Sequence, residues 1–286
     1  MKKYLGIDIG GTSIKYGLYN GDGQSLNKDG EVPSVRDDFD KILSILTEIV
    51  NKFPDVDGIG VSVPGGVDKR TRVMFDGGAC VALTGKDLRS VMQEKFKIPV
   101  EIENDANCAA LAELWKGNGR GCENFVCITV GTGIGGGIVI DGKLYAGANS
   151  FAGEFGYMMM NLHGERMDLH GTASTSMTIQ KLSEQTGLDI KDGRTFFASM
   201  DKPEVKEAYD NWVRELAIGI HNIALGLDPE KVLLGGGVSA QPGFIEDLNK
   251  ALNELKIYDF KWFVEQCYFK NDAGKVGAVY KLISTK

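Results

Sequence analysis

The chain has 286 residues, 43% of them hydrophobic, and carries a formal net charge of −7. This length can bury a large core and favours two lobes over one large domain. The acidic balance, with no run of Lys or Arg, argues against nucleic acid or an anionic membrane as the main partner and favours a small solute. No stretch approaches about 18 uninterrupted apolar residues, and the first residues lead straight into a strand, so we expect a soluble, cytoplasmic protein.

The cysteines are odd in number and contain no close C-x-x-C pair. This pattern is typical of neither a disulfide framework nor a zinc site. We therefore expect reduced structural thiols at all five positions, Cys80, Cys108, Cys122, Cys127 and Cys267.

The chain begins with LGIDIGGTSIKYGLYNGDG (5–23), an apolar strand, a Gly-Gly-Thr turn, a second strand and an Asn-Gly hairpin signal. The spacing of Ile and Leu then predicts a helix over 39–53. GIGVSVPGGV (58–67) predicts a buried strand that ends in a Pro-Gly-Gly loop, and VEIEND (100–105) predicts a strand that ends at Asn104 and Asp105. A helix rich in Ala and Leu follows at 106–115.

The opening hairpin is repeated later in the chain. A shift of 121 positions places Leu5, Ile7 and Gly10 on Val126, Ile128 and Gly131 without a gap. Hairpins can match by chance, but we favour duplication, with one copy at the start of each lobe. A helical region (about 173–226), the strand KVLLGGG (231–237), a further helix and a last helix (274–283) follow. This alternation of strands and helices predicts an α/β architecture.

The second glycine turn fits G-x-G-x-x-G, but β-branched residues follow it instead of a helix, which excludes a Rossmann site. Neither turn has the P-loop pattern, and the chain lacks the H-R-D and D-F-G motifs of protein kinases. Two such turns can offer backbone N–H groups to phosphate oxygens, and Asp8 can hold Mg²⁺ directly or through water. Thr12 and Thr132 can add hydroxyl donors. The alternative is that these are ordinary tight hairpins in which glycine serves only to allow positive φ. That alternative explains one glycine-rich turn well, but it explains a matched pair of turns less well.

Five motifs, taken in order, resemble the ROK family of sugar kinases in the actin-like ATPase superfamily: LGIDIGGTSIKYGL, IGVSVPGGVD, IENDANCAALAE, VGTGIGGGIVIDGKLYAGANSFAGEFGY and LLGGGVS. The resemblance implies an actin-like (ribonuclease H-like) α/β fold of two lobes, each a mixed sheet flanked by helices, with a cleft between them. We place the lobes at 1–105, with a helix of about 273–286 returning to it, and 106–272. The resemblance also implies ATP- and Mg²⁺-dependent phosphoryl transfer to a hexose hydroxyl, usually O6. The family commonly forms dimers, so a homodimer is a candidate assembly.

Asp105 is the residue we expect to act as general base, although an Asp before a helix is also a good N-cap. Asn104 and Glu154 are expected to bind sugar hydroxyls, and Gly65 and Gly66 to shape the sugar-side loop. The remaining expected contacts are to ATP and Mg²⁺: Asp8, Gly10, Gly11, Thr12, Gly131, Thr132 and Gly133 at the phosphates, and Gly235, Gly236 and Gly237 near adenosine.

The chain departs from the family at its zinc motif. Most members follow the Glu with Gly-His and a C-x-C-G-x-x-G-C segment, whereas this chain has Tyr157 and no cysteine in NLHGERMDLHGTAST. His163 and His170 alone cannot close a tetrahedral site, so we predict no zinc. His170 aligns with a sugar-reading Glu of the family, and a plain loop histidine is the alternative.

If Tyr157 and His170 line the sugar pocket, recognition around C1 and C2 of the sugar differs from that of a typical glucokinase. A β-glucoside or an N-acetylhexosamine such as N-acetylmannosamine then joins glucose and fructose as a candidate substrate. Two alternatives to a sugar kinase stay open: a non-catalytic sugar- or nucleotide-binding sensor on the same fold, and a different phosphotransferase or ATPase of the superfamily.

Overall fold

A computed structural model of the chain describes residues 1–161, 167–255 and 263–285. The chain forms two units. Unit 1 contains Met1–Arg120, Leu144–Ala152 and Asn271–Lys286, and unit 2 contains Gly121–Lys143 and Gly153–Lys270. Two five-stranded mixed sheets flanked by helices confirm the predicted fold class.

The sheet of unit 1 has the order β3-β2-β1-β4-β5. Strand β1 pairs antiparallel with β2 and parallel with β4, and β4 pairs parallel with β5. The three parallel strands therefore end at one edge of the sheet. The strands span Lys3–Ile9 (β1), Ser13–Asn20 (β2), Gly30–Pro33 (β3), Gly58–Val63 (β4) and Val100–Asn104 (β5).

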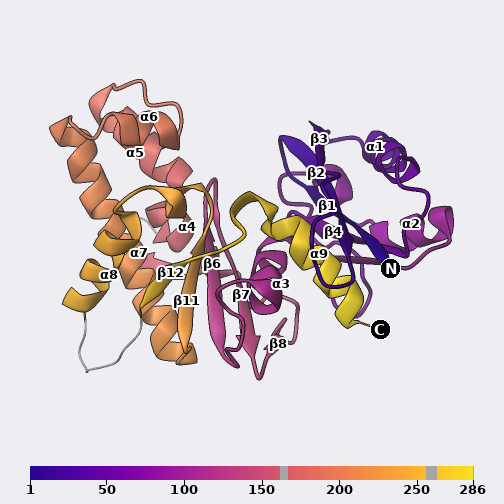
Figure 1. The fold of residues 1–286 in the computed structure, drawn as a ribbon. Coiled ribbons are helices and arrows are strands. Elements are labelled where there is room, and N and C mark those ends of the chain that lie inside the picture. Colours follow the sequence, from indigo (N-terminus) through magenta and orange to yellow (C-terminus); the bar gives the residue numbers. More distant parts are fainter. Residues whose placement is uncertain (162–166, 256–262, 286) are drawn as a thin grey trace. The chain divides into compact units, whose positions relative to one another are not determined.

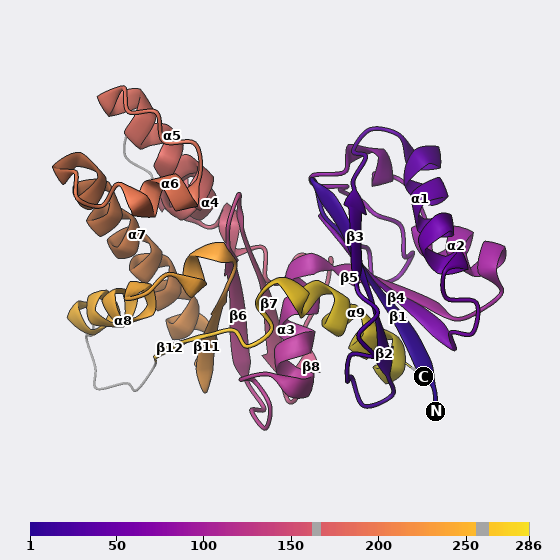
Figure 2. The ribbon, with the colours of Figure 1, turned by 45° about the horizontal axis from the view of Figure 1, so that its top comes forward.

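Helices cover both faces of this sheet. Helices α1 and α2 lie on one face, and α3 and α9 lie on the other (Figures 1 and 2). Helix α9 packs closely on β4, and glycine at position 60 allows this approach. A Cβ added at Gly60 would lie 2.2 Å from the carbonyl oxygen of Ala278 in α9. The helices of unit 1 span Phe39–Asn51 (α1), Val81–Leu83 (η1), Leu88–Phe96 (α2), Asp105–Lys116 (α3) and Ala273–Ser284 (α9), with η4 (Lys270–Asp272) at the boundary.

The sheet of unit 2 repeats this topology, in the order β12-β11-β6-β7-β8. Strand β6 pairs antiparallel with β7 and parallel with β11, and β11 pairs parallel with β12. The 121-residue shift brings β1 onto β6 and β2 onto β7, so the two predicted hairpins occupy equivalent positions in the two sheets. The strands span Phe125–Val130 (β6), Ile134–Ile140 (β7), Lys143–Leu144 (β8), Lys231–Gly235 (β11) and Val264–Gln266 (β12).

The helical region predicted at about 173–226 is divided into three helices, α5, α6 and α7. Gly187 ends α5 in the left-handed conformation, and Pro203 occupies the first turn of α7. Two short strands, β9 (Met159–Asn161) and β10 (Met167–Asp168), form a separate ladder. The helices of unit 2 span Phe155–Tyr157 (η2), Leu169–Ala173 (α4), Thr175–Thr186 (α5), Gly193–Ala198 (α6), Pro203–Leu227 (α7), Gly237–Ala240 (η3) and Phe244–Glu254 (α8).

All five cysteines are buried and none forms a disulfide, as predicted. Within residues 1–161, 167–255 and 263–285, no helix is both long enough and apolar enough to cross a bilayer.

Candidate functional site

In unit 1, the predicted site residues gather at the carboxyl end of the parallel strands. Asp8 pairs across β1 and β4 with Ser62, and Val63 pairs across β4 and β5 with Asn104. Because the strands run in parallel, the residues that follow each strand emerge side by side. The same edge thus carries Asp8, Gly10, Gly11, Thr12, Gly65, Gly66, Asn104 and Asp105.

Asp8 belongs to β1, and its side chain lies against the first turn of α9. The Ser62 hydroxyl donates to Oδ1 of Asp8 at 2.6 Å, and a Cβ added at Gly274 would lie 2.5 Å from the Asp8 carboxylate. Burial raises the pKa of this carboxyl, and the hydrogen bond from Ser62 opposes that rise. A carboxylate held in this way is a suitable oxygen ligand for Mg²⁺ or for its bound water.

Asn104, and not Asp105, caps helix α3. Oδ1 of Asn104 accepts from the backbone N–H of Asn107 at 3.0 Å, so the alternative N-cap role for Asp105 is wrong. Asp105 occupies the first helical position and is exposed. Its Oδ1 accepts from the backbone of Ala106 at 2.8 Å and from the Asn104 amide at 3.1 Å. These contacts fix an exposed carboxylate at a helix N-terminus, where the helix dipole stabilises its charge.

Glu103 anchors this helix start to α9. Its buried carboxylate accepts from Lys281 Nζ at 2.7 Å, from the Asn107 side chain at 3.1 Å and from the Asn104 backbone at 3.1 Å. The ion pair is largely shielded, with 21% of the Lys281 side chain and 11% of the Glu103 side chain exposed. The residue before the Asn104–Asp105 pair is therefore held by charge as well as by packing.

Lys281→Met is expected to lower the free energy of unfolding by about 3 kcal/mol, because it leaves the Glu103 carboxylate buried without its cation. Urea unfolding measures this change. The matched control is Lys206→Met, which breaks an exposed pair with Asp210 on α7 and should cost less than about 1 kcal/mol. Equal losses in the two variants would contradict a structural role for the buried pair.

The first glycine turn is shaped by backbone contacts. Gly10 N–H donates to the carbonyl of Ser13 at 2.9 Å, and the guanidinium of Arg36 donates to the carbonyl of Gly11. Thr12 is exposed at the tip of the turn. The sequence pattern did not single out Arg36, which adds a positive charge beside a turn expected to bind phosphate.

In unit 2, the second glycine turn lies against the start of α5. The backbone N–H of Thr175 donates to the carbonyl of Gly131 at 3.0 Å, and the Ser176 hydroxyl donates to that of Thr132. Thr132 is exposed, as Thr12 is in the first turn. Gly131 has no positive φ, and a Cβ added there would meet no described atom within 4 Å. Packing does not require glycine at this position, whereas close approach of a ligand to the main chain would.

The Gly235–Gly237 run ends β11 beside the same turn. Gly236 has φ of 89°, and a Cβ added there would lie 2.1 Å from the carbonyl oxygen of Val130, so only glycine fits. Gly237 faces open space in the described structure. The parallel pairing of β6 with β11 thus brings the two glycine segments together at one edge.

His170 lies on the second turn, and the η2 segment that Glu154 precedes and Tyr157 ends packs beside it through Gly156. Nδ1 of His170 accepts from the backbone N–H of Ile134 at 3.4 Å, and a Cβ at Gly133 would lie 2.7 Å from Cε1 of the ring. Glu154 precedes the short helix η2, and Tyr157 at its end is 62% exposed. His170 therefore packs on the glycine turn itself.

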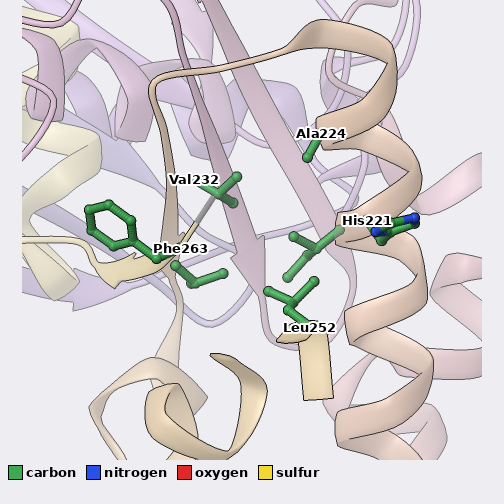
Figure 3. A pocket seen from close by; sticks show the side chains of 7 residues that line it. His221, Ala224, Val232, Leu252 and Phe263 are labelled. Carbon is green, nitrogen blue, oxygen red and sulfur yellow. The ribbon is translucent and has the colours of Figure 1, made fainter. Parts of the chain in front are cut away.

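Two cavities in unit 2 include none of the predicted site residues. A pocket of about 10 Å³ lies among α7, β11, α8 and β12, with Ala224, Val232 and Leu252 in its wall (Figure 3). It holds about one water and is too small for a sugar or nucleotide. A cavity of about 500 Å³ lies beside α5 and α7, where the Trp212 indole donates to the carbonyl of Ala173. Both cavities are therefore separate from the residues expected to bind sugar and ATP.

No group of three or more His, Cys, Asp or Glu side chains with metal-binding geometry occurs in the described part of the chain. His163, named above among the possible zinc ligands, lies outside the described residues.

The ROK family model matches residues 4–284. A β-glucoside kinase of Listeria innocua is 34% identical over 290 residues, which cover 98% of this chain and 97% of that protein. Among solved structures, the Lmo2764 protein of Listeria monocytogenes has a TM-score of 0.91 at 33% identity, with 99% of both chains covered. A ROK family protein of Streptococcus pneumoniae TIGR4 in complex with sucrose has a TM-score of 0.90 at 31% identity, with 99% of this chain and 98% of that chain covered. The family model covers nearly the whole chain, and the two sheets match the fold of the related structures. The chain therefore belongs to the ROK family.

Proposed function

We propose that the chain is an ATP-dependent sugar kinase that transfers the γ-phosphoryl group of ATP to a hydroxyl of a hexose or hexoside, at O6. The observation that carries this proposal is the exposed carboxylate of Asp105, held at the start of α3 on the same sheet edge as Asp8 and the first glycine turn. Its relative in Listeria innocua, a β-glucoside kinase, supports the substrate class.

Asp105 acts as the general base in this proposal. Its carboxylate accepts the proton of the attacking hydroxyl while the sugar oxygen bonds to the γ-phosphorus, and the bond from that phosphorus to the bridging oxygen breaks to release ADP. Asn104 already donates its amide to Asp105 and to the carbonyl of Gly65. It thereby orients the base and the sugar-side loop together.

The glycine segments are proposed to bind the nucleotide. In this proposal the turns Gly10–Thr12 and Gly131–Gly133 let the phosphates approach the main chain and the exposed threonine hydroxyls, while the Gly10 and Gly131 N–H groups close the turns themselves. Gly235–Gly237 approaches adenosine. The open space beside Gly131 and Gly237 supports this role, because packing gives no other reason for glycine at either position.

Asp8 is proposed to hold Mg²⁺, directly or through water. The oxygen donor and its partly exposed position fit that ion. When bound, Mg²⁺ neutralises charge that develops on the phosphate oxygens. Ser62 fixes the orientation of the carboxylate by donating to its Oδ1.

Glu154, Tyr157 and His170 are proposed to complete sugar recognition from unit 2. We also propose that the enzyme needs no zinc. Support comes from the cysteines, since Cys80, Cys108, Cys122, Cys127 and Cys267 all belong to buried packing and none lies in the segment where the family places its zinc ligands.

The proposal predicts ADP release that requires a sugar, ATP and Mg²⁺ together. The assay compares glucose, fructose, mannose, N-acetylmannosamine, N-acetylglucosamine and cellobiose, each with and without a zinc-selective chelator. We expect turnover on one class of sugar, unchanged by the chelator. Sugar or nucleotide binding without turnover on any sugar would favour the sensor, and sugar-independent ATP hydrolysis would favour a different ATPase.

A further inference from the structure

The loop after β4 carries an aromatic side chain beside the proposed sugar-binding residues. Gly65 accepts from the Asn104 amide at 2.9 Å. Gly66 N–H donates to the carbonyl of Asp76, and Phe75 N–H donates to the carbonyl of Gly66, both at 3.0 Å. A Cβ added at Gly66 would lie 2.0 Å from Cζ of Phe75, so the ring rests directly on this glycine. The fold thus fixes Phe75 next to the loop that contacts Asn104.

A second ring reaches Phe75 from a distant part of unit 1. Phe151 stacks on Phe75 with ring centroids 5.6 Å apart and ring planes 20° apart. Polar contacts hold the two segments together: the backbone N–H of Lys69 donates to the Ser150 hydroxyl at 2.9 Å, and its ammonium donates to the carbonyl of Gly147. The stacked pair is therefore part of a built surface and not an isolated exposed ring.

Both rings remain accessible, with 39% of Phe75 and 54% of Phe151 exposed. A paired exposed aromatic surface is uncommon unless something binds to it, because covering it removes apolar area from water. Its flat face suits a ring that has C–H groups on one side and hydroxyls around its rim, as a pyranose has. Packing on aromatic faces of this kind contributes by both buried area and ring geometry.

We propose that Phe75 and Phe151 form an aglycone subsite that packs against the second ring of a β-glucoside while the first ring is phosphorylated. The inference rests on the proposed function, in which Asp105 accepts the proton from a hydroxyl of that first ring. Asn104 contacts Gly65, and Phe75 lies on the next residue, Gly66, so the aromatic pair adjoins the loop proposed to lie beside the first ring. The substrate class is a β-glucoside whose aglycone is itself a ring, such as cellobiose. The relative that holds sucrose shows a two-ring sugar in a protein of this family.

The test compares Phe151→Ala and Phe151→Tyr with Phe263→Ala, which removes a 45% exposed ring immediately before β12 in unit 2. KM and kcat are measured with cellobiose and with glucose, and both sugars are titrated calorimetrically without ATP. Phe151→Ala should raise KM and Kd for cellobiose about tenfold, while kcat and the constants for glucose change less than about twofold. Phe151→Tyr should restore cellobiose binding, and Phe263→Ala should leave both sugars unaffected.

An equal loss for glucose and cellobiose, or unchanged cellobiose binding in Phe151→Ala, would overturn the subsite. Wild-type protein that binds cellobiose no more tightly than glucose would overturn it as well. If no sugar is phosphorylated but calorimetry still shows the selective loss for cellobiose, the kinase proposal fails and the subsite stands. The two hypotheses are therefore separable in one set of variants.

Discussion

Asp105→Asn is expected to lower kcat about a thousandfold on the preferred sugar, because the amide cannot accept the hydroxyl proton. Asn has the same shape, and its oxygen can still accept from the backbone of Ala106 at the first position of α3. The fold and both binding steps should therefore survive. Steady-state kinetics with calorimetric titration of ATP and sugar measures turnover and binding separately.

Asp87→Asn is the matched control, since Asp87 is also a carboxylate at the start of a helix in unit 1. Its side chain caps α2 by accepting from the backbone of Ser90 at 2.9 Å. We expect at most a modest loss of stability in that variant and no change in kcat. If Asp105→Asn retains wild-type turnover, or loses sugar binding together with turnover, Asp105 is not the base.

The second large effect is expected for Asp8→Asn, which removes the only charge we assign to Mg²⁺ binding. Losing several kcal/mol of charge stabilisation in the transition state corresponds to a fall in kcat of about a hundredfold or more. Stability should not fall with activity, because the Asp8 carboxylate loses part of its hydration beside the buried Ser62 and the start of α9, a cost that the neutral amide of Asn avoids. Activity as a function of Mg²⁺ concentration, together with thermal unfolding, tests both parts.

Ser62→Ala separates orientation of Asp8 from its charge. This variant keeps the carboxylate but removes the hydroxyl that donates to it at 2.6 Å. We expect it to need a higher Mg²⁺ concentration for half-maximal rate while reaching a kcat close to wild type. Full activity of Asp8→Asn at ordinary Mg²⁺ concentrations would rule out Asp8 as the metal ligand.

Local patterns in the sequence were sufficient for much of the fold. The apolar alternation and hairpin signals at 5–23 and 126–142 predicted two copies of one hairpin, and both sheets are built around them. Helix α1 follows from its apolar spacing, and β4 and β5 follow from buried runs bounded by turn residues. These elements are specified by residues close to one another in the chain, so local sequence patterns are enough to predict them.

Other features depend on contacts between distant residues, which a single sequence does not reveal. Ser62 reaches Asp8 only because β1 and β4 pair in one particular register. Phe75 meets Phe151 across 76 positions of the chain, where Lys69 also binds Ser150, and neither contact has a local sequence signal. Strand β12 is three residues long and has no periodic pattern to predict it. The choice between Asn104 and Asp105 as helix cap was decided by side-chain geometry that both residue types permit.

Helix α9 follows unit 2 in the chain, yet it packs on β1, β4 and α3 of unit 1. On the ribosome, every strand of unit 2 is made before residues 273–284 emerge. Until then, that face of the first sheet lacks its α9 cover and has only α3, so a nascent chain in that state exposes apolar surface that α9 later buries. Unit 1, whose first strand is synthesised first, therefore reaches its complete packing only after the chain of unit 2 has been made.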